Sequence, residues 1–226
     1  MNSFNTSLNA DRRLSARLAC VFLIFVTISS QLRAEQGEAD RKLLGSIKAR
    51  AEKGDSIAQV GLGGIYSLGM LGVSTNLTEA VKWFRKAADQ GIAGGQYNLG
   101  VAYSKGDGVT KDVAEAVKWY RKAAEQGDAA AQYNLGVCYY EGKGVAQNYA
   151  EAVKWYRKSA DQEYAEAQCN LGVCYAKGQG VAQDYTESAK WLSKSAIQGF
   201  VVAQFSLGLL CHTGDGVAKD YVEAYK

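Results

Sequence analysis

The sequence predicts an all-α fold, a solenoid of stacked helix–turn–helix repeats with a period of 36 residues. Three observations lead to this fold class. The four tryptophans, Trp83, Trp119, Trp155 and Trp191, lie 36 residues apart, and a fixed period of this length is typical of stacked repeat units. The chain has no proline, and its 25 glycines recur where helices are expected to end. A start signal for a helix also recurs once in every unit.

The first helix of each unit is expected in segments such as "AAAQYNLGVCYYEG", residues 129–142. Ala131, Leu135 and Tyr139 recur four residues apart, which places them in one apolar stripe along a helix. Gly142 and Gly144 follow, and glycine at this place supplies the left-handed residue that ends a helix. Equivalent glycine pairs occur in the other units: Gly106 and Gly108, Gly178 and Gly180, and Gly214 and Gly216.

The second helix of each unit is expected to begin with a capping box, an Asp or Asn followed three residues later by Glu. The first side chain accepts a hydrogen bond from an exposed backbone N–H, and the Glu side chain reaches back to the cap residue. Five pairs fit this pattern: Asn76/Glu79, Asp112/Glu115, Asn148/Glu151, Asp184/Glu187 and Asp220/Glu223. Gly91, Gly127 and Gly199 are expected to close these helices, whereas Glu163 takes that place in the third unit and predicts a slightly looser turn.

The repeats divide the chain into a leader, a capping helix and five units. The leader covers residues 1–34, and residues 35–54 are expected to form an N-terminal capping helix. The units cover about 55–91, 92–127, 128–163, 164–199 and 200–226. The first unit has an extra residue within Gly69–Val73, so its turn should bulge. The fifth stops one residue before its expected tryptophan, so we expect a truncated array; the alternative is a half-repeat that acts as a cap.

The leader has the layout of a secretory signal peptide. Arg12, Arg13 and Arg17 precede an apolar stretch at 18–30 that is short for a membrane span, and Thr27 and Ser29 supply a small-residue cleavage site. This layout predicts export to the periplasm or the secreted space, with no membrane span in the mature chain. The alternatives are an uncleaved leader that anchors the chain in the membrane, and a misassigned start that leaves an intracellular adaptor.

The charge balance argues against nucleic acid as the partner. The leader carries four of the 26 basic residues and one of the 23 acidic residues, which leaves 22 of each in the rest of the chain. A surface that neutralises phosphates needs an excess of basic residues.

The segment "AQYNLGVCYYEGKGVAQNYAEAVKWYRKSA", residues 131–160, resembles the Sel-1-like repeat, a relative of the tetratricopeptide repeat. The resemblance covers about residues 55–226 and implies that the units stack into a right-handed superhelix. The consensus residues of that family are scaffold residues, so the resemblance implies a binding surface without naming a ligand.

The sequence predicts no catalytic, cofactor-binding or metal-binding residues. His212 is the only histidine, which excludes paired-histidine metal sites within one chain, and we expect it on a tolerant, partly exposed helix position. No Ser-x-x-Lys or Gly-x-Ser-x-Gly motif occurs, and the glycine pairs do not fit phosphate-binding loops.

The cysteines are expected to be buried and unpaired. Cys138 and Cys174 occupy equivalent positions in neighbouring units, about 8–10 Å apart, which is beyond disulfide reach. Cys174–Cys211 is the least unfavourable bridge. Some secreted, cysteine-rich relatives of the family carry a disulfide in every repeat and are described as penicillin-binding or weakly β-lactamase-like; this chain lacks their regular pairing.

A column of asparagines is the candidate binding site. Asn98, Asn134 and Asn170 recur every 36 residues beside the apolar stripe of the first helices, followed by Ser206. Because first helices line the concave side of such superhelices, the amides are placed to bond an extended peptide. The alternative is that they join neighbouring helices or face water. Tyr140 and Glu141 are variable neighbours that could tune the choice of partner.

The function that these features favour is a non-enzymatic adaptor or scaffold of the cell envelope or secreted space, which binds a protein or peptide along its concave face. The alternative function is a penicillin-binding or weakly β-lactamase-like hydrolase.

Overall fold

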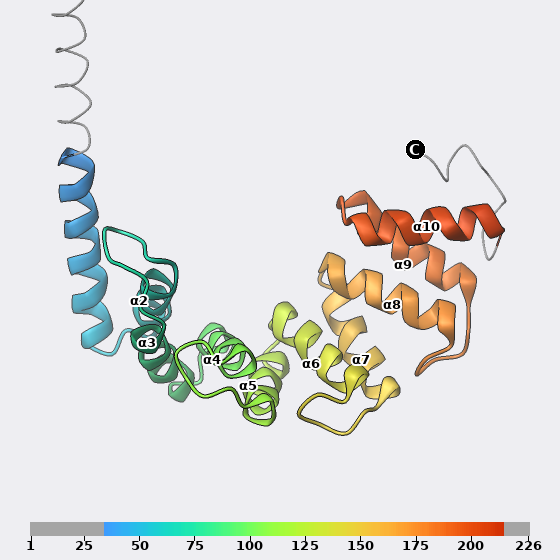
Figure 1. Ribbon diagram of the computed structural model, residues 1–226, viewed down its shortest axis with the longest axis horizontal. Coiled ribbons are helices and arrows are strands. Elements are labelled where there is room, and N and C mark those ends of the chain that lie inside the picture. The colour runs from blue at the N-terminus through green and yellow to red at the C-terminus, as the bar shows by residue number, and fades with distance from the viewer. Residues whose placement is uncertain (1–33, 215–226) are drawn as a thin grey trace, which may run out of the picture.

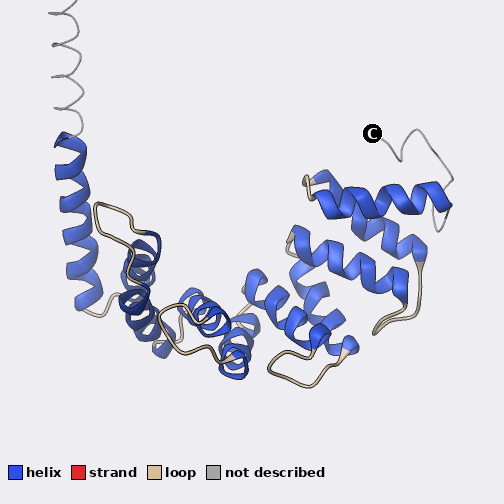
Figure 2. Ribbon diagram, in the orientation of Figure 1, coloured by secondary structure: helices blue, strands red, loops and turns tan. Residues whose placement is uncertain are grey.

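A computed structural model describes residues 34–214, which are helical throughout apart from short turns (Figure 2). A helix over residues 34–52 comes first. The helices that follow are α2 (Ser56–Leu68), α3 (Leu77–Asp89), α4 (Ala93–Lys105), α5 (Val113–Glu125), α6 (Ala129–Glu141), α7 (Tyr149–Ala160), α8 (Ala165–Lys177), α9 (Tyr185–Ile197) and α10 (Val201–Thr213). No strand occurs in this part of the chain, and the all-α prediction is confirmed.

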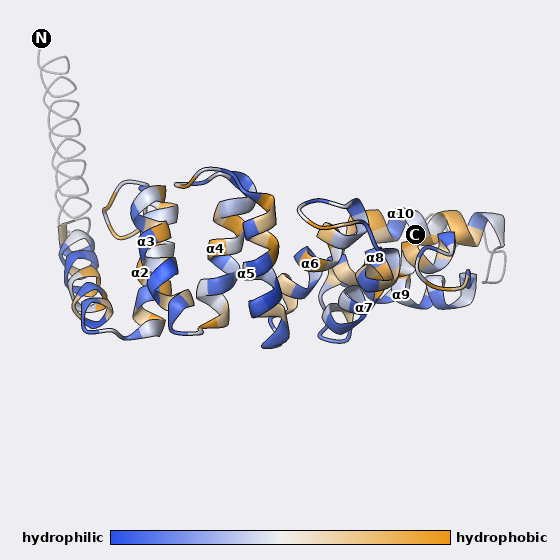
Figure 3. Ribbon diagram, turned by 90° about the horizontal axis from the view of Figure 1, so that it is seen from below, coloured by the Kyte–Doolittle hydropathy of each residue, from blue (hydrophilic) through white to orange (hydrophobic). Residues whose placement is uncertain are grey.

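The helices pair into hairpins that stack side by side in a curved array (Figure 1). In each hairpin a first helix (α2, α4, α6 or α8) packs on the second helix that follows it, and each second helix packs on the next first helix. In Figure 1, α4 lies toward the inside of the arc and α5 toward its outside. Apolar residues form clusters that continue from one hairpin to the next, and Figure 3 shows apolar and polar positions interspersed along the helices, with apolar side chains of α10 such as Val201 and Phe205 exposed. The predicted solenoid is therefore the observed architecture.

Two predicted segments lie mainly or partly beyond the described residues. The leader, apart from residue 34, is one of them, and the fifth unit from residue 215 onward is the other, including Gly216 and the capping pair Asp220/Glu223. Within residues 34–214, no helix combines the length and the apolar character that a bilayer crossing requires.

The second helices begin with half of the predicted capping box. The side chains of Asn76, Asp112, Asn148 and Asp184 each accept a hydrogen bond from the backbone N–H three residues later. The Glu side chains are not placed as predicted, because each pairs with the Lys three residues on, as Glu115 does with Lys118 at 2.8 Å. The cap N–H groups already donate to a carbonyl of the preceding first helix; that of Asp112 bonds Tyr103 at 2.9 Å. A backbone carbonyl of the preceding first helix thus accepts the hydrogen bond that the Glu side chain accepts in a complete capping box.

The first helices end at the predicted glycines. Gly69, Gly106, Gly142, Gly178 and Gly214 all have positive φ angles, between 65° and 86°. The extra residue of the first unit is accommodated in the turn that follows, where Leu71 also takes a positive φ of 54°. That turn still closes with the hydrogen bond from the Asn76 N–H to the Tyr66 carbonyl at 2.8 Å, so the predicted bulge leaves the hairpin intact.

The turn at Glu163 is not looser than its equivalents, contrary to the prediction. Glu163 takes a φ of 64°, the left-handed conformation that Gly127 and Gly199 adopt in the neighbouring units. The turn keeps the same hydrogen bonds, because the N–H of Glu163 bonds Ala160 at 3.0 Å and that of Tyr164 bonds Ser159 at 3.3 Å. The packing of the next helix therefore fixes the turn, and the Glu side chain bears a conformational cost.

Replacing Glu163 by Gly is expected to stabilise the protein by about 0.5–1 kcal/mol, since glycine adopts a positive φ without steric cost. Urea unfolding followed by circular dichroism measures the change. Glu163→Ala is the matched control, because alanine removes the carboxylate but keeps the strain. Equal stability of the Gly and Ala variants would contradict this explanation.

The tryptophans form part of a core that runs from unit to unit. Trp83, Trp119, Trp155 and Trp191 are only 5–8% exposed, which confirms their predicted place in the packing between helices. Trp119 belongs to one apolar cluster with residues of α3 and α4, including Val81 and Leu99, so it helps to join two units. Each indole ring is also covered by the Lys three residues later, with ammonium-to-ring distances of 4.0–4.4 Å.

A ladder of buried glutamines, which the sequence analysis did not single out, also joins the units. Gln96, Gln132 and Gln168 are 2–5% exposed, and each donates to a carbonyl at the end of the preceding second helix. Each also accepts from the side-chain amide of a second glutamine 30 residues later, at 2.7–2.9 Å. Because an unpaired buried amide is costly, these bonds fix the spacing of the units.

Arginine–tyrosine pairs form a further set of ties between units. The guanidinium of Arg121 donates to the Tyr139 hydroxyl at 2.6 Å, and Arg85 and Arg157 bond Tyr103 and Tyr175 in the same way. At the α9–α10 junction both members are replaced, because Ser193 and Cys211 occupy the equivalent positions. This junction therefore lacks a bond that the three earlier ones share.

Candidate functional site

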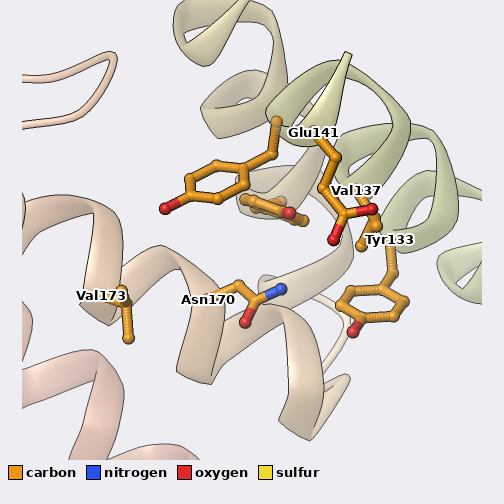
Figure 4. A pocket seen from close by; sticks show the side chains of 7 residues that line it. Tyr133, Val137, Glu141, Asn170 and Val173 are labelled. Atoms are coloured by element: carbon orange, nitrogen blue, oxygen red, sulfur yellow. The ribbon is translucent and has the colours of Figure 1, made fainter. Parts of the chain in front are cut away.

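The candidate site is a hollow of about 230 Å³ between the first helices of the third and fourth units (Figure 4). It is lined by three tyrosines, two polar side chains and two valines: Tyr133, Tyr140, Tyr156, Glu141, Asn170, Val137 and Val173. Figure 4 shows Glu141 of α6 and Asn170 of α8 pointing toward one another across the hollow, with Tyr133 beside them. Aromatic walls with two facing polar groups are typical of a small binding site.

Helical spacing brings these side chains together. Tyr133, Val137 and Glu141 are four residues apart on α6, so they share one face, and Asn170 and Val173 are three apart on α8. The α6 helix is fixed at both ends, because the Asp128 side chain accepts from the Ala131 N–H and Gly142 ends the helix with a φ of 70°. Tyr156 comes from α7 and packs behind the hollow, where it is 1% exposed.

The two accessible tyrosine rings are held in place by their neighbours. The Tyr140 hydroxyl donates to Gln179 Oε1 at 2.6 Å, and its ring meets that of Tyr149 edge-on with centroids 5.1 Å apart. The Tyr133 ring lies 5.3 Å from that of Tyr164 and 6.0 Å from that of Tyr156. Because both rings are immobilised beforehand, a ligand that packs against them loses less conformational entropy on binding.

The tyrosines of the hollow are neutral at physiological pH. Burial raises the pKa of Tyr133 and that of Tyr140, and neighbouring carboxylates add to the rise, Glu166 for Tyr133 and Glu141 for both. The Glu141 carboxylate forms an ion pair with Lys143 at 2.6 Å, and both side chains are exposed. The hollow thus combines neutral aromatic rings with negative charge at its edge.

The structure brings together three of the five residues predicted as the site, namely Tyr140, Glu141 and Asn170. Asn98 lies elsewhere, in a smaller hollow of about 60 Å³ lined by residues of α2, α3 and α4, and its Nδ2 donates to the Gly94 carbonyl at 2.8 Å. Asn134 interacts with the Tyr97 hydroxyl, as Asn170 does with those of Tyr133 and Tyr156. The amides of Asn134 and Asn170 therefore contact neighbouring helices, one of the roles that the sequence left open, whereas the amide of Asn98 bonds its own helix.

Sequence reasoning missed Tyr133 and Tyr156 as parts of the hollow. The pairing of Tyr97 with Tyr120 in the second unit repeats that of Tyr133 with Tyr156, with ring centroids 6.2 and 6.0 Å apart. Gly136 makes room for this arrangement, since a Cβ there would lie 2.6 Å from the Tyr156 ring. The sequence signal for this part of the hollow was thus a Tyr and a Gly on the first helix and a Tyr on the second, as in Tyr133, Gly136 and Tyr156.

The cysteines are buried and free, as predicted. Cys138, Cys169, Cys174 and Cys211 form no disulfide among the described residues. Burial raises the pKa of Cys138, Cys169 and Cys174 to about 11. His212 lies on an exposed position of α10. Residues 34–214 contain no group of three or more His, Cys, Asp or Glu side chains arranged to hold a metal ion.

The buried thiols should react slowly in the folded protein. At pH 8 a pKa of about 11 in place of 9 lowers the thiolate fraction about a hundredfold. Ellman's reagent should therefore modify Cys138, Cys169 and Cys174 slowly in the folded protein and rapidly in denaturant. Their burial also contributes stability that is complete below pH 9 and is lost as the pH rises through 11. Rapid modification of any of these three cysteines in folded protein at pH 8, located by mass spectrometry, would contradict this placement.

The stacked hairpins and the inter-unit ladder define an α-solenoid repeat protein. The chain belongs to the Sel1 repeat family, whose model matches residues 56–92, 93–128, 129–164, 165–200 and 201–226. No curated protein sequence matches this chain.

Solved structures agree with this assignment. A protective antigen of uropathogenic Escherichia coli with an SLR fold is 42% identical over 80% of this chain, with a TM-score of 0.77; this chain spans 38% of that one. A Sel1 repeat protein from Oxalobacter formigenes is 36% identical over 84% of this chain and 80% of its own, with a TM-score of 0.74. An immunity protein from Pseudomonas aeruginosa shares the fold, with a TM-score of 0.51. It is 24% identical over 74% of this chain and 61% of its own.

Proposed function

We propose that this chain is a non-enzymatic adaptor that binds an extended protein or peptide segment along the first helices of its solenoid. The observation that carries the proposal is the hollow in which Tyr140, Glu141 and Asn170 converge between two units. A repeat scaffold suits this task because its contact points have fixed spacing, so a long partner is ordered once and held at several places.

The proposal includes export to the cell envelope or secreted space. It rests on the arginines and the apolar stretch of the leader, a layout typical of a signal peptide. Mass spectrometry of the mature N-terminus tests it: cleavage shortly after residue 30 supports export, and an intact Met1 contradicts cleavage.

Binding can be tested with the full chain and a phage-displayed library of random 12-residue peptides. We expect selected peptides to bind the wild type and to bind at least about tenfold more weakly to a variant in which Asn98, Asn134 and Asn170 are all alanine. The matched control replaces Lys82, Lys118 and Lys154 by alanine. These residues have the same 36-residue spacing and lie on the exposed face of the second helices. This control should bind as the wild type does.

Two results would overturn the proposal. One is a failure to select any peptide on folded protein; the other is equal binding by the asparagine variant and the wild type. Nitrocefin turnover above background would favour the hydrolase alternative, which has no support from the cysteines because none of the four described is in a disulfide.

A further inference from the structure

The third unit departs from its neighbours at the hollow. Tyr140 and Glu141 stand where the second unit has Ser104 and Lys105 and the fourth has Ala176 and Lys177. The scaffold therefore repeats from unit to unit, but the third unit has an aromatic ring in place of a small side chain and a negative charge in place of a positive one. This difference concerns what the hollow can bind, because both positions line it or lie at its edge.

The size of the hollow fits one side chain of a partner. Its volume of about 230 Å³ is below the range of roughly 300–1,000 Å³ that sites for drug-sized ligands occupy. It opens between two first helices, and Figure 4 shows the Glu141 carboxylate and the Asn170 amide directed into the same space. A long side chain that enters between the rings would meet the Glu141 carboxylate.

The chemistry of the lining selects a cation. Tyrosine faces attract ammonium and guanidinium groups, and the attraction is stronger where water is excluded. Tyr133 and Tyr140 are fixed by their ring contacts, and Glu141 adds a formal negative charge. A further carboxylate, that of Glu166, lies close enough to Tyr133 to raise the pKa of its hydroxyl.

The cation already present does not block the hollow. Lys143 pairs with Glu141 at 2.6 Å, but its side chain is 66% exposed and that of Glu141 is 41% exposed. Exposed ion pairs are weak because water and salt screen them, so a cation that also contacts the rings can replace Lys143. We infer that the hollow between α6 and α8 binds a lysine or arginine side chain of the partner segment, with Glu141 as its counter-ion and Tyr133 and Tyr140 as its aromatic walls.

This inference rests on the proposed function, and the same random 12-residue library tests the two separately. Peptides selected on the wild type should be enriched in Lys or Arg at one position. Replacing that residue by norleucine, which keeps the length and removes the charge, should weaken binding about tenfold. Glu141→Gln should weaken the Lys peptide by a similar factor and leave the norleucine peptide unchanged, and Tyr140→Ala should weaken the Lys peptide.

Glu125→Gln is the control for loss of one exposed carboxylate, and its affinity should match the wild type. If no peptide is selected, the proposed function fails. If peptides are selected without enrichment in Lys or Arg, or if folded Glu141→Gln binds the Lys peptide as the wild type does, only the cation site is overturned.

Discussion

Replacing Trp155 by Ala is expected to lower the free energy of unfolding by about 3–5 kcal/mol. Trp155 is 8% exposed and lies in an apolar cluster that runs through the second, third and fourth units and includes Val117, Leu135 and Tyr156. Removal of the indole leaves a cavity between helices that the glutamine bonds and glycine turns hold at a fixed distance, so collapse of the cavity is restricted. Urea unfolding followed by circular dichroism measures the loss.

Trp155→Phe separates the aromatic volume from the polar group of the ring. The indole N–H groups of all four tryptophans are buried without a hydrogen-bond partner in the described structure. Phenylalanine therefore loses no hydrogen bond, and we expect a cost below about 1.5 kcal/mol. A melting curve of Trp155→Ala that coincides with that of the wild type would contradict the placement of this side chain in the core.

Replacing Gly144 by Ala is expected to destabilise the protein by about 2–4 kcal/mol, since two costs add. Gly144 has a φ of 69°, which a residue with a Cβ rarely adopts. The new Cβ would also lie 2.5 Å from the Val113 carbonyl oxygen and 2.7 Å from its carbon. These atoms are backbone at the start of the preceding second helix, so relief of the clash requires two units to separate.

Gly127→Ala is the matched control for this variant. Gly127 has a φ of 94°, and a Cβ there would meet no atom within 4 Å. Only the conformational cost remains, about 1 kcal/mol. If the two alanine variants lose the same stability in urea, close approach between the units has no part in the role of Gly144.

The fold was predictable because its signals are local and repeat in register. The cap side chain of Asp112 and the left-handed Gly142 each act within one turn of a helix, and each recurs every 36 residues. Trp119 was predictable as core for the same reason. Such signals predict where each helix begins and ends without information on which helices pack together.

The parts that sequence reasoning missed depend on contacts between helices. Some depend on contacts within a hairpin: Glu115 pairs with Lys118 because the N–H of Asp112 is already bonded to Tyr103 on the first helix of the same unit. Glu163 takes a strained φ because the neighbouring helices fix its turn. Likewise, the hollow forms only where Tyr140 of one unit faces Asn170 of the next, so Tyr140 and Glu141 were predicted as variable neighbours but not as walls of one cavity.

The glutamine and arginine ties have a consequence for how such genes change length. The glutamine partners are 30 residues apart and the arginine–tyrosine partners 18 apart, both less than one period. An unequal recombination event that adds or deletes 36 residues within the second to fourth units therefore leaves each of these buried glutamines opposite its partner. The extra residue of the first unit lies in a turn and leaves the bond from Gln90 to Gln59 in place at 2.7 Å. An insertion within a helix would instead move the buried amides away from their partners, so arrays of this kind should grow and shrink in whole units or at turns.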